Sequence, residues 1–130
     1  MYKKMVTNLM VENVDKVIDF YEDILGFSVV ATVPGKDGGF QFAILVKDGL
    51  ELMVQERGNL IEEYPVLDTP KVYPSASLYI AVDDLDKLYS KLKAKYTISK
   101  ELHTSFYGAR EFAITDVDGY VLTFTDHKGA

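Results

Sequence analysis

The sequence contains one pattern twice, and this internal repeat restricts the fold more than any other feature does. The tripeptide FAI occurs at residues 42–44 and again at residues 112–114, and the dipeptide DG occurs at residues 48–49 and 118–119. Both matches have the same offset (112 − 42 = 70 and 118 − 48 = 70). Similarity at a fixed offset indicates that one structural unit is present twice.

The residues around these matches predict the same order of elements in each copy. Residues 11–16 resemble residues 82–87 (82 − 11 = 71), and in both places a residue that can cap a helix precedes apolar residues at helical spacing. We therefore predict two β-α-β-β-β units. The expected elements are strands at 4–11, 27–33, 75–82 and 96–102, helices that include 14–25 and 85–92, a loop at 103–108, and hairpins at 40–55 and 110–125.

The length of the chain fits one domain, residues 1–130. Within it, module one covers residues 1–57 and module two covers residues 75–130. Residues 58–74 contain three of the four prolines and no clear periodicity, so we predict a linker there. A linker of this length permits the modules to pair within one chain or to exchange between two chains.

Charge and composition exclude several functions. The net charge of −6 argues against nucleic-acid binding, because phosphate contacts require clustered lysine and arginine. It would favour a cationic small molecule, but an acidic balance is also ordinary for cytosolic proteins and reflects solubility more than partners. The absence of cysteine excludes disulfides and thiolate chemistry. The first residues do not predict a signal peptide, and the sequence has no apolar run of about 18 residues. We expect a cytoplasmic protein with neither a nucleic-acid nor a membrane partner.

Two stretches resemble the vicinal oxygen chelate superfamily, which includes glyoxalase I, the bleomycin-resistance proteins and extradiol dioxygenases. Residues 9–27, LMVENVDKVIDFYEDILGF, are similar to the opening strand and helix of the superfamily. Residues 110–120, REFAITDVDGY, are similar to its closing turn, with Val117 in place of a proline. Residues 51–56, ELMVQE, resemble the bleomycin-resistance-like members most. The resemblance implies an α+β fold, in which two tandem βαβββ modules form a curled mixed sheet around a concave pocket.

The resemblance also implies where a divalent metal ion would bind. The four corresponding positions carry Val6, Met53, Ser77 and Thr123, none of which is a strong metal ligand. Glu51 shares a strand face with Met53 and supplies a single carboxylate. The two histidines, His103 and His127, lie outside these positions. We therefore expect neither a metal ion nor another cofactor.

Catalysis without a metal requires a nucleophile beside a base, or two carboxylates in different environments. His103 precedes Thr104 and Ser105, but a polar loop with a solvated histidine explains this group better. Asp116 and Asp118 lie in a hairpin turn, where aspartate favours turn formation. We predict no catalytic residue.

Strand alternation, together with the resemblance, predicts a set of side chains that face the pocket. These candidate ligand-binding residues are Asn8, Met10, Phe40, Phe42, Glu51, Met53, Gln55, Tyr79, Phe106, Tyr107, Arg110 and Thr123. Alternative roles remain open for some of them: Met53 could be part of the core, the Tyr79 hydroxyl could bond at a module interface, and Arg110 could form a structural ion pair. The mixed aromatic, amide and carboxylate character suits a planar or elongated ligand.

The resulting hypothesis is a metal-free homodimer similar to bleomycin-resistance proteins, which sequesters an aromatic or cationic small molecule and thereby gives antibiotic resistance. Nine tyrosines and seven phenylalanines favour a dimer, because aromatic residues are enriched at interfaces. One alternative is a metal-dependent, glyoxalase-like lyase, isomerase or dioxygenase. Another is a protein that only mediates assembly, with its pocket filled by its own side chains.

Overall fold

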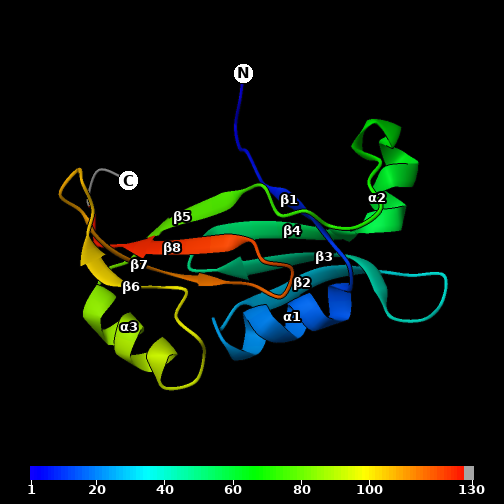
Figure 1. Ribbon diagram of the computed structural model, residues 1–130. Helices are drawn as coiled ribbons and strands as arrows, with labels where there is room; N and C mark the ends of the chain where they lie inside the picture. Colours follow the sequence, from blue (N-terminus) through cyan, green and yellow to red (C-terminus); the bar gives the residue numbers. More distant parts are fainter. Residues whose placement is uncertain (128–130) are drawn as a thin grey trace. The chain divides into compact units, whose positions relative to one another are not determined.

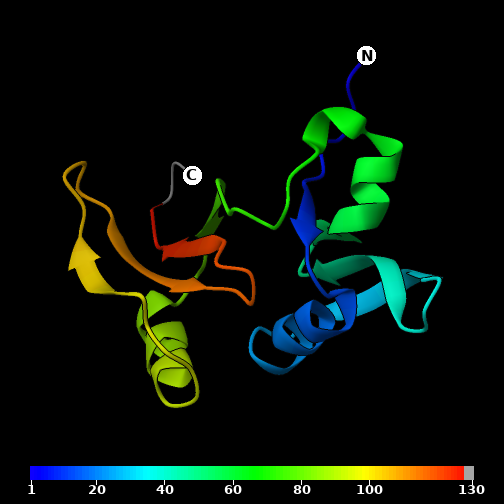
Figure 2. The same ribbon diagram turned by 45° about the vertical axis from the view of Figure 1, so that its right-hand side comes forward.

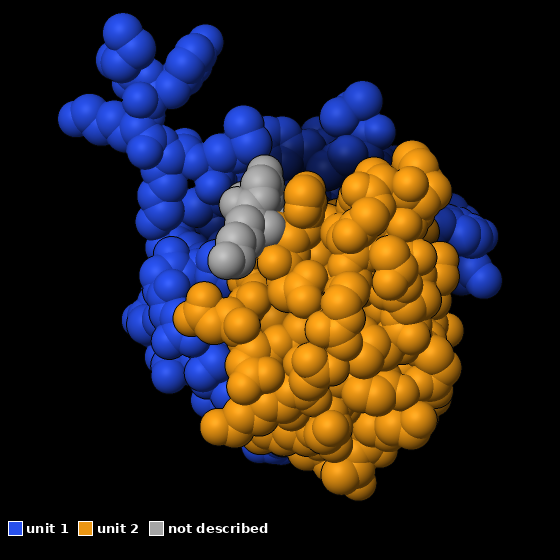
Figure 3. All heavy atoms as spheres, turned by 90° about the vertical axis from the view of Figure 1, so that its left-hand side faces the viewer, with its two compact units in different colours: residues 1–73 blue, residues 74–130 orange. Residues whose placement is uncertain are grey.

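The two halves of the chain form separate four-stranded sheets, each with a helix packed on one face. The computed structural model describes residues 1–127, and the chain divides into the units Met1–Tyr73 and Pro74–Ala130 (Figure 3). Both units have the predicted β-α-β-β-β order (Figure 1), which confirms the α+β fold class and the tandem modules.

The first unit has the strand order β1-β4-β3-β2. Its strands are β1 (Asn8–Val11), β2 (Ser28–Pro34), β3 (Phe40–Lys47) and β4 (Leu50–Glu56), and its helices are α1 (Val14–Asp23), α2 (Arg57–Glu63) and the short 3₁₀ helix η1 (Pro65–Leu67). Strands β1 and β4 are parallel, and the other pairs are antiparallel. α1 covers one face of this sheet, and α2 lies on its other side (Figures 1 and 2).

The second unit repeats this layout with the strand order β5-β8-β7-β6. Its elements are β5 (Ser77–Ala81), α3 (Leu85–Lys93), β6 (Lys100–Thr104), β7 (Arg110–Thr115) and β8 (Val121–Thr125). Both predicted helix starts are confirmed. The Asn13 side chain accepts from the Lys16 backbone N–H at 3.0 Å, and the Asp84 side chain accepts from the Lys87 backbone N–H at 3.1 Å.

The structure differs from the sequence-based prediction in two segments. The second strand of the second unit begins at Lys100 rather than at residue 96, so His103 lies in β6 and not in a loop. Residues 94–96 continue the end of α3, where the Tyr96 N–H donates to the Leu92 carbonyl. The predicted linker at 58–74 contains most of α2. This helix buries only Leu60, so it has no apolar periodicity that the sequence could reveal.

The two hairpins differ by one residue in length, and this changes which side chains face the helix. The core pair of the first hairpin is Leu45 with Leu52, seven residues apart (52 − 45 = 7), whereas that of the second is Ile114 with Leu122, eight apart (122 − 114 = 8). Because side chains alternate along a strand, the repeated FAI motifs have opposite orientations. Phe112 is fully buried, whereas its sequence equivalent Phe42 is only partly buried.

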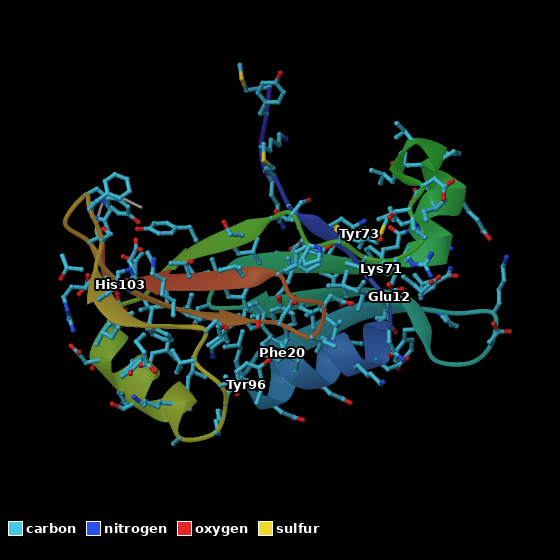
Figure 4. The ribbon with its side chains drawn as sticks, viewed as in Figure 1. Glu12, Phe20, Lys71, Tyr73, Tyr96 and His103 are labelled. Atoms are coloured by element: carbon cyan, nitrogen blue, oxygen red, sulfur yellow. The ribbon has the colours of Figure 1, made fainter. Side chains whose placement is uncertain are left out.

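Glu12 connects the start of the first unit to the segment that follows α2. Its carboxylate accepts from Arg57 Nε at 2.9 Å and from the Val72 backbone N–H at 2.7 Å, near Lys71 (Figure 4). The hydrogen bond from Arg57, followed by that from Val72, lowers the pKa of Glu12 below its ordinary value of 4.5.

A carboxylate with a lowered pKa stabilises the folded state above its unfolded-state pKa, and this contribution is lost as the pH falls through the lower folded-state pKa. We therefore expect the amide proton resonance of Val72 to titrate with a midpoint below 4.5. The E12Q variant should show no such titration and faster Val72 amide exchange at neutral pH. The E22Q variant, altered on the exposed side of α1, should behave like the wild type. A midpoint at or above 4.5 would contradict the assignment.

Candidate functional site

The first unit contains an open pocket between the sheet face opposite α1 and the helix α2. Its volume is about 600 Å³. The sheet contributes Asn8 from β1, Phe42 from β3 and Gln55 from β4. Three of the predicted ligand-binding residues are thus brought together. The remaining lining comes from Val33, Gln41, Asn59, Glu62, Glu63 and Tyr64.

A chain of amide hydrogen bonds fixes α2 to the sheet beside this pocket. Asn8 Nδ2 donates to Gln55 Oε1 at 2.8 Å, and Gln55 Nε2 donates to Asn59 Oδ1 at 2.7 Å and to Glu63 Oε1 at 3.1 Å. Asn59 Nδ2 donates in turn to Gln41 Oε1 at 3.1 Å. Gln55 is only 6% exposed, so these bonds satisfy a buried amide and fix the orientation of the Glu63 carboxylate.

The remaining groups of the pocket are carboxylates and aromatic rings. Glu62 and Glu63 lie next to each other on α2, and Phe42 and Tyr64 provide the aromatic surface. Lys36 approaches Glu62 at 3.5 Å, but both side chains are mostly exposed, so this pair neutralises little of the charge. The pocket therefore combines negative charge with aromatic surface, which suits a ligand with a cationic group and an apolar ring.

Other predicted residues of this unit share the sheet face without lining the pocket. Met10 is paired with Gln55, and Met53 with Asn8, so both lie on the same face by register. Glu51 follows on that face, but its carboxylate forms an ion pair with Lys4 at 2.6 Å. Phe40 lines a smaller adjoining pocket at the β2–β3 loop instead.

In the second unit, two of the predicted tyrosines meet on a buried carboxylate. The Tyr79 hydroxyl donates to Glu111 Oε2 at 2.8 Å, and the Tyr107 hydroxyl donates to the same oxygen. Glu111 is 7% exposed. The hydrogen bond to Glu111, and then that to Tyr79, raises the pKa of Tyr107 well above its ordinary value. Tyr107 thus remains a hydrogen-bond donor throughout the physiological pH range.

His103 lies beside this carboxylate, on the neighbouring strand β6 (Figure 4). Its Nδ1 atom is 2.8 Å from the Glu101 carbonyl oxygen, and its Nε2 atom is 3.8 Å from Glu111 Oε1. Because a carbonyl oxygen only accepts hydrogen bonds, Nδ1 carries a hydrogen. In the neutral ring, Nε2 therefore presents a lone pair to the carboxylate.

The other predicted residues of the second unit have different surroundings. Arg110 forms ion pairs with Asp86 at 2.6 Å and with Asp126 at 3.4 Å. These contacts agree with the alternative role of Arg110 in a structural ion pair. Phe106 is fully exposed in the loop between β6 and β7. Thr123 is paired with Tyr79 in the sheet. The assignment of these residues to a ligand site stays a prediction.

The residues at the metal-binding positions do not fit a divalent ion. Met53 offers a thioether, Ser77 and Thr123 offer neutral hydroxyls, and Val6 offers no ligand atom. The nearby Glu51 is paired with Lys4. Within residues 1–127, no three His, Cys, Asp or Glu side chains lie close enough together to hold a metal ion.

Glu111 and the α2 residues Asn59 and Glu63 were not predicted from the sequence. Glu111 could have been found from the hairpin register, because it is the direct partner of Thr125 on the face already considered. Asn59 and Glu63 lie one helical turn apart, but a helix with a single buried residue leaves no signal to place them.

Comparison with known proteins gives a match over nearly the whole chain. The family model described as Glyoxalase/Bleomycin resistance protein/Dioxygenase superfamily matches residues 5–124. No curated protein matches the chain significantly. None of the helices in residues 1–127 is both long and apolar enough to cross a membrane.

Several solved structures have a similar fold. TioX from Micromonospora sp. ML1 is 22% identical, with a TM-score of 0.73 over 97% of this chain and 99% of that one. TnmS3, an antibiotic binding protein from Streptomyces sp. CB03234, is 20% identical, with a TM-score of 0.71 over 96% of this chain and 95% of that one. Lactoylglutathione lyase from Agrobacterium tumefaciens is 17% identical, with a TM-score of 0.74 over 95% and 92%. At these identities the similarity establishes the fold alone.

Proposed function

Because the chain belongs to the Glyoxalase/Bleomycin resistance protein/Dioxygenase superfamily, we propose that it binds a small aromatic or cationic molecule without a metal ion. The site is the pocket between the first sheet and α2. The observation that carries the proposal is the position of two carboxylates, Glu62 and Glu63, beside the Phe42 and Tyr64 rings in a pocket of about 600 Å³.

The shape and the chemistry of this pocket support binding rather than assembly alone. A volume of about 600 Å³ lies within the range of small-molecule sites. The buried Gln55, itself bonded to Asn59, donates to Glu63 and holds its carboxylate in place before a ligand arrives, so little side-chain freedom is lost on binding. An antibiotic binding protein among the similar structures is consistent with the same use of this fold.

The choice between a binding protein and a metal-dependent enzyme rests on the ligand atoms present. The similar structures include a lyase, so the fold supports both functions. Here Val6, Met53, Ser77 and Thr123 lack the imidazole and carboxylate groups that hold a divalent ion. Elemental analysis of protein purified without chelators should therefore find no stoichiometric metal. Stoichiometric Ni, Zn, Fe or Mn would favour the enzyme instead.

We expect thermal-shift screening with bleomycin-type cationic glycopeptides and a panel of cationic, neutral and anionic aromatic compounds to identify a ligand. A compound at 100 times its Kd should stabilise the protein by about 2.7 kcal/mol. For the best cationic compound, F42A and E63Q should each raise Kd about tenfold, which corresponds to about 1.4 kcal/mol. The charge-matched E22Q variant, altered on α1, should leave Kd unchanged. If no compound raises the melting temperature, the proposal fails.

The proposal includes a homodimer in the cytoplasm, with a second copy completing the pocket. Large exposed aromatic side chains, such as Tyr2, Tyr64 and Tyr73, support an interface between copies. Light scattering at micromolar concentration should give twice the monomer mass. A strictly monomeric protein that still binds the ligand would remove the dimer from the proposal. The biological role would be antibiotic resistance by sequestration, so expression should raise the drug tolerance of a sensitive bacterium.

A further inference from the structure

We propose that Glu111, His103, Tyr79 and Tyr107 form a second binding site, which takes the primary ammonium group of an arylalkylamine. The site lies entirely within the second unit and shares no residue with the pocket proposed above. Its basis is a buried carboxylate whose neighbours are two phenols and an imidazole instead of a strong cation.

A carboxylate that is 7% exposed normally has a lysine or arginine partner. Among residues 1–127, no such side chain forms an ion pair with Glu111, and the adjacent Arg110 is paired with Asp86 and Asp126. The two phenol hydroxyls both donate to Glu111 Oε2. The negative charge of Glu111 is thus hydrogen-bonded, and the ion pair that His103 offers it at 3.8 Å exists only when the imidazole is protonated.

The second oxygen of this carboxylate faces another hydrogen-bond acceptor. Glu111 Oε1 and His103 Nε2 are 3.8 Å apart, and in the neutral imidazole neither atom carries a hydrogen, because Nδ1 donates to the Glu101 carbonyl. Two acceptors that face each other leave a position for a donor between them. A primary ammonium group has three N–H donors and can give one to each acceptor.

The surface around this position is aromatic and accessible. Tyr79 is 45% exposed, and Tyr107 is 47% exposed. The Phe106 ring packs edge-on against the Tyr107 ring, with the two ring centroids 4.9 Å apart. Aromatic rings beside a carboxylate attract a cation through both charge and ring electrons. They also provide an apolar surface for the hydrocarbon part of the ligand. Together these groups match an ammonium joined by a short chain to an aromatic ring.

The test is an NMR titration of the full chain with 2-phenylethylamine hydrochloride at pH 7.5. We expect saturable shifts of the Tyr79, Tyr107 and His103 side-chain resonances. The neutral analogue 2-phenylethanol should bind at least about tenfold more weakly, and E111Q should weaken amine binding at least about tenfold. The matched control is E101Q, because exposed Glu101 also accepts from a phenol, that of Tyr89, and it should leave binding unchanged.

Measurements on further variants distinguish binding at this site from binding in the pocket of the first unit. F42A should not affect the amine-induced shifts; if it abolishes them, the amine occupies the first pocket and the second site is wrong. Should E111Q fail to fold, Y79F replaces it, with a smaller loss of affinity expected. Equal binding of the alcohol and the amine, or equal losses in E101Q and E111Q, would overturn the proposal.

Discussion

Replacing Phe112 with alanine is expected to destabilise the protein by about 4 kcal/mol, the usual cost of removing a fully buried phenylalanine. The Phe112 ring has no exposed surface. It packs edge-on against Tyr89 of α3, with ring centroids 5.2 Å apart, and stacks on Phe124 at the same distance. Urea denaturation followed by circular dichroism measures the loss.

The matched substitution is F42A, because Phe42 occupies the same place in the repeated FAI motif. Its side chain is only partly buried and lines the pocket, so we expect a loss of about 1 kcal/mol. F112L, which keeps most of the buried volume, should cost about 1.5 kcal/mol or less. Equal losses in F42A and F112A would contradict the opposite orientations of the two motifs.

The second large effect is expected at Asp116. Its Oδ1 atom accepts from the backbone N–H groups of Asp118 at 3.1 Å, Gly119 at 3.1 Å and Tyr120 at 2.9 Å. The residue is 5% exposed, so D116A removes a buried acceptor that three backbone donors share, and only the Gly119 N–H keeps the Asp116 backbone carbonyl as a second acceptor within this turn. We expect D116A to lower the free energy of unfolding by about 3 kcal/mol, as measured by urea denaturation.

Asparagine is the informative control at this position, because its side-chain oxygen can accept the same three hydrogen bonds without the charge. D116N should cost about 1 kcal/mol, since hydrogen bonds to a charged acceptor are stronger than those to a neutral one. If D116A and D116N lose equal stability, the charge rather than the hydrogen-bond geometry determines the effect. A loss below about 0.5 kcal/mol for D116A would refute the structural role of Asp116 in the turn.

Much of the fold could be predicted because both copies of the internal repeat carry the same sequence signals. The helix caps Asn13 and Asp84 lie directly before apolar residues at helical spacing, so local chemistry and long-range packing agree there. The start of β6 could not be placed, because residues 96–102 are β-prone while the end of α3 extends over part of them. Tertiary contacts decide such a boundary.

The candidate site was predicted only where strand alternation determines the direction of a side chain. Asn8 and Gln55 lie on β1 and β4 at positions that this rule fixes, and both line the pocket. Glu51 follows the same rule, but its pairing with Lys4 depends on an N-terminal segment without regular structure. The position of α2 over the sheet depends on amide contacts that have no sequence period.

The additional residue in the second hairpin has a consequence for how duplicated proteins diverge. Gln55 of β4 and Thr125 of β8 are equivalent positions, 70 residues apart (125 − 55 = 70). Gln55 is paired with Phe42, and Thr125 is paired with Glu111. The structural counterpart of Phe42 is therefore Glu111 and not Phe112. A single inserted residue in a turn therefore exchanges the outward and inward residues of a whole strand. One copy of a gene duplication can thus acquire a new recognition surface from its former core through a change in turn length, without any substitution in the strand itself.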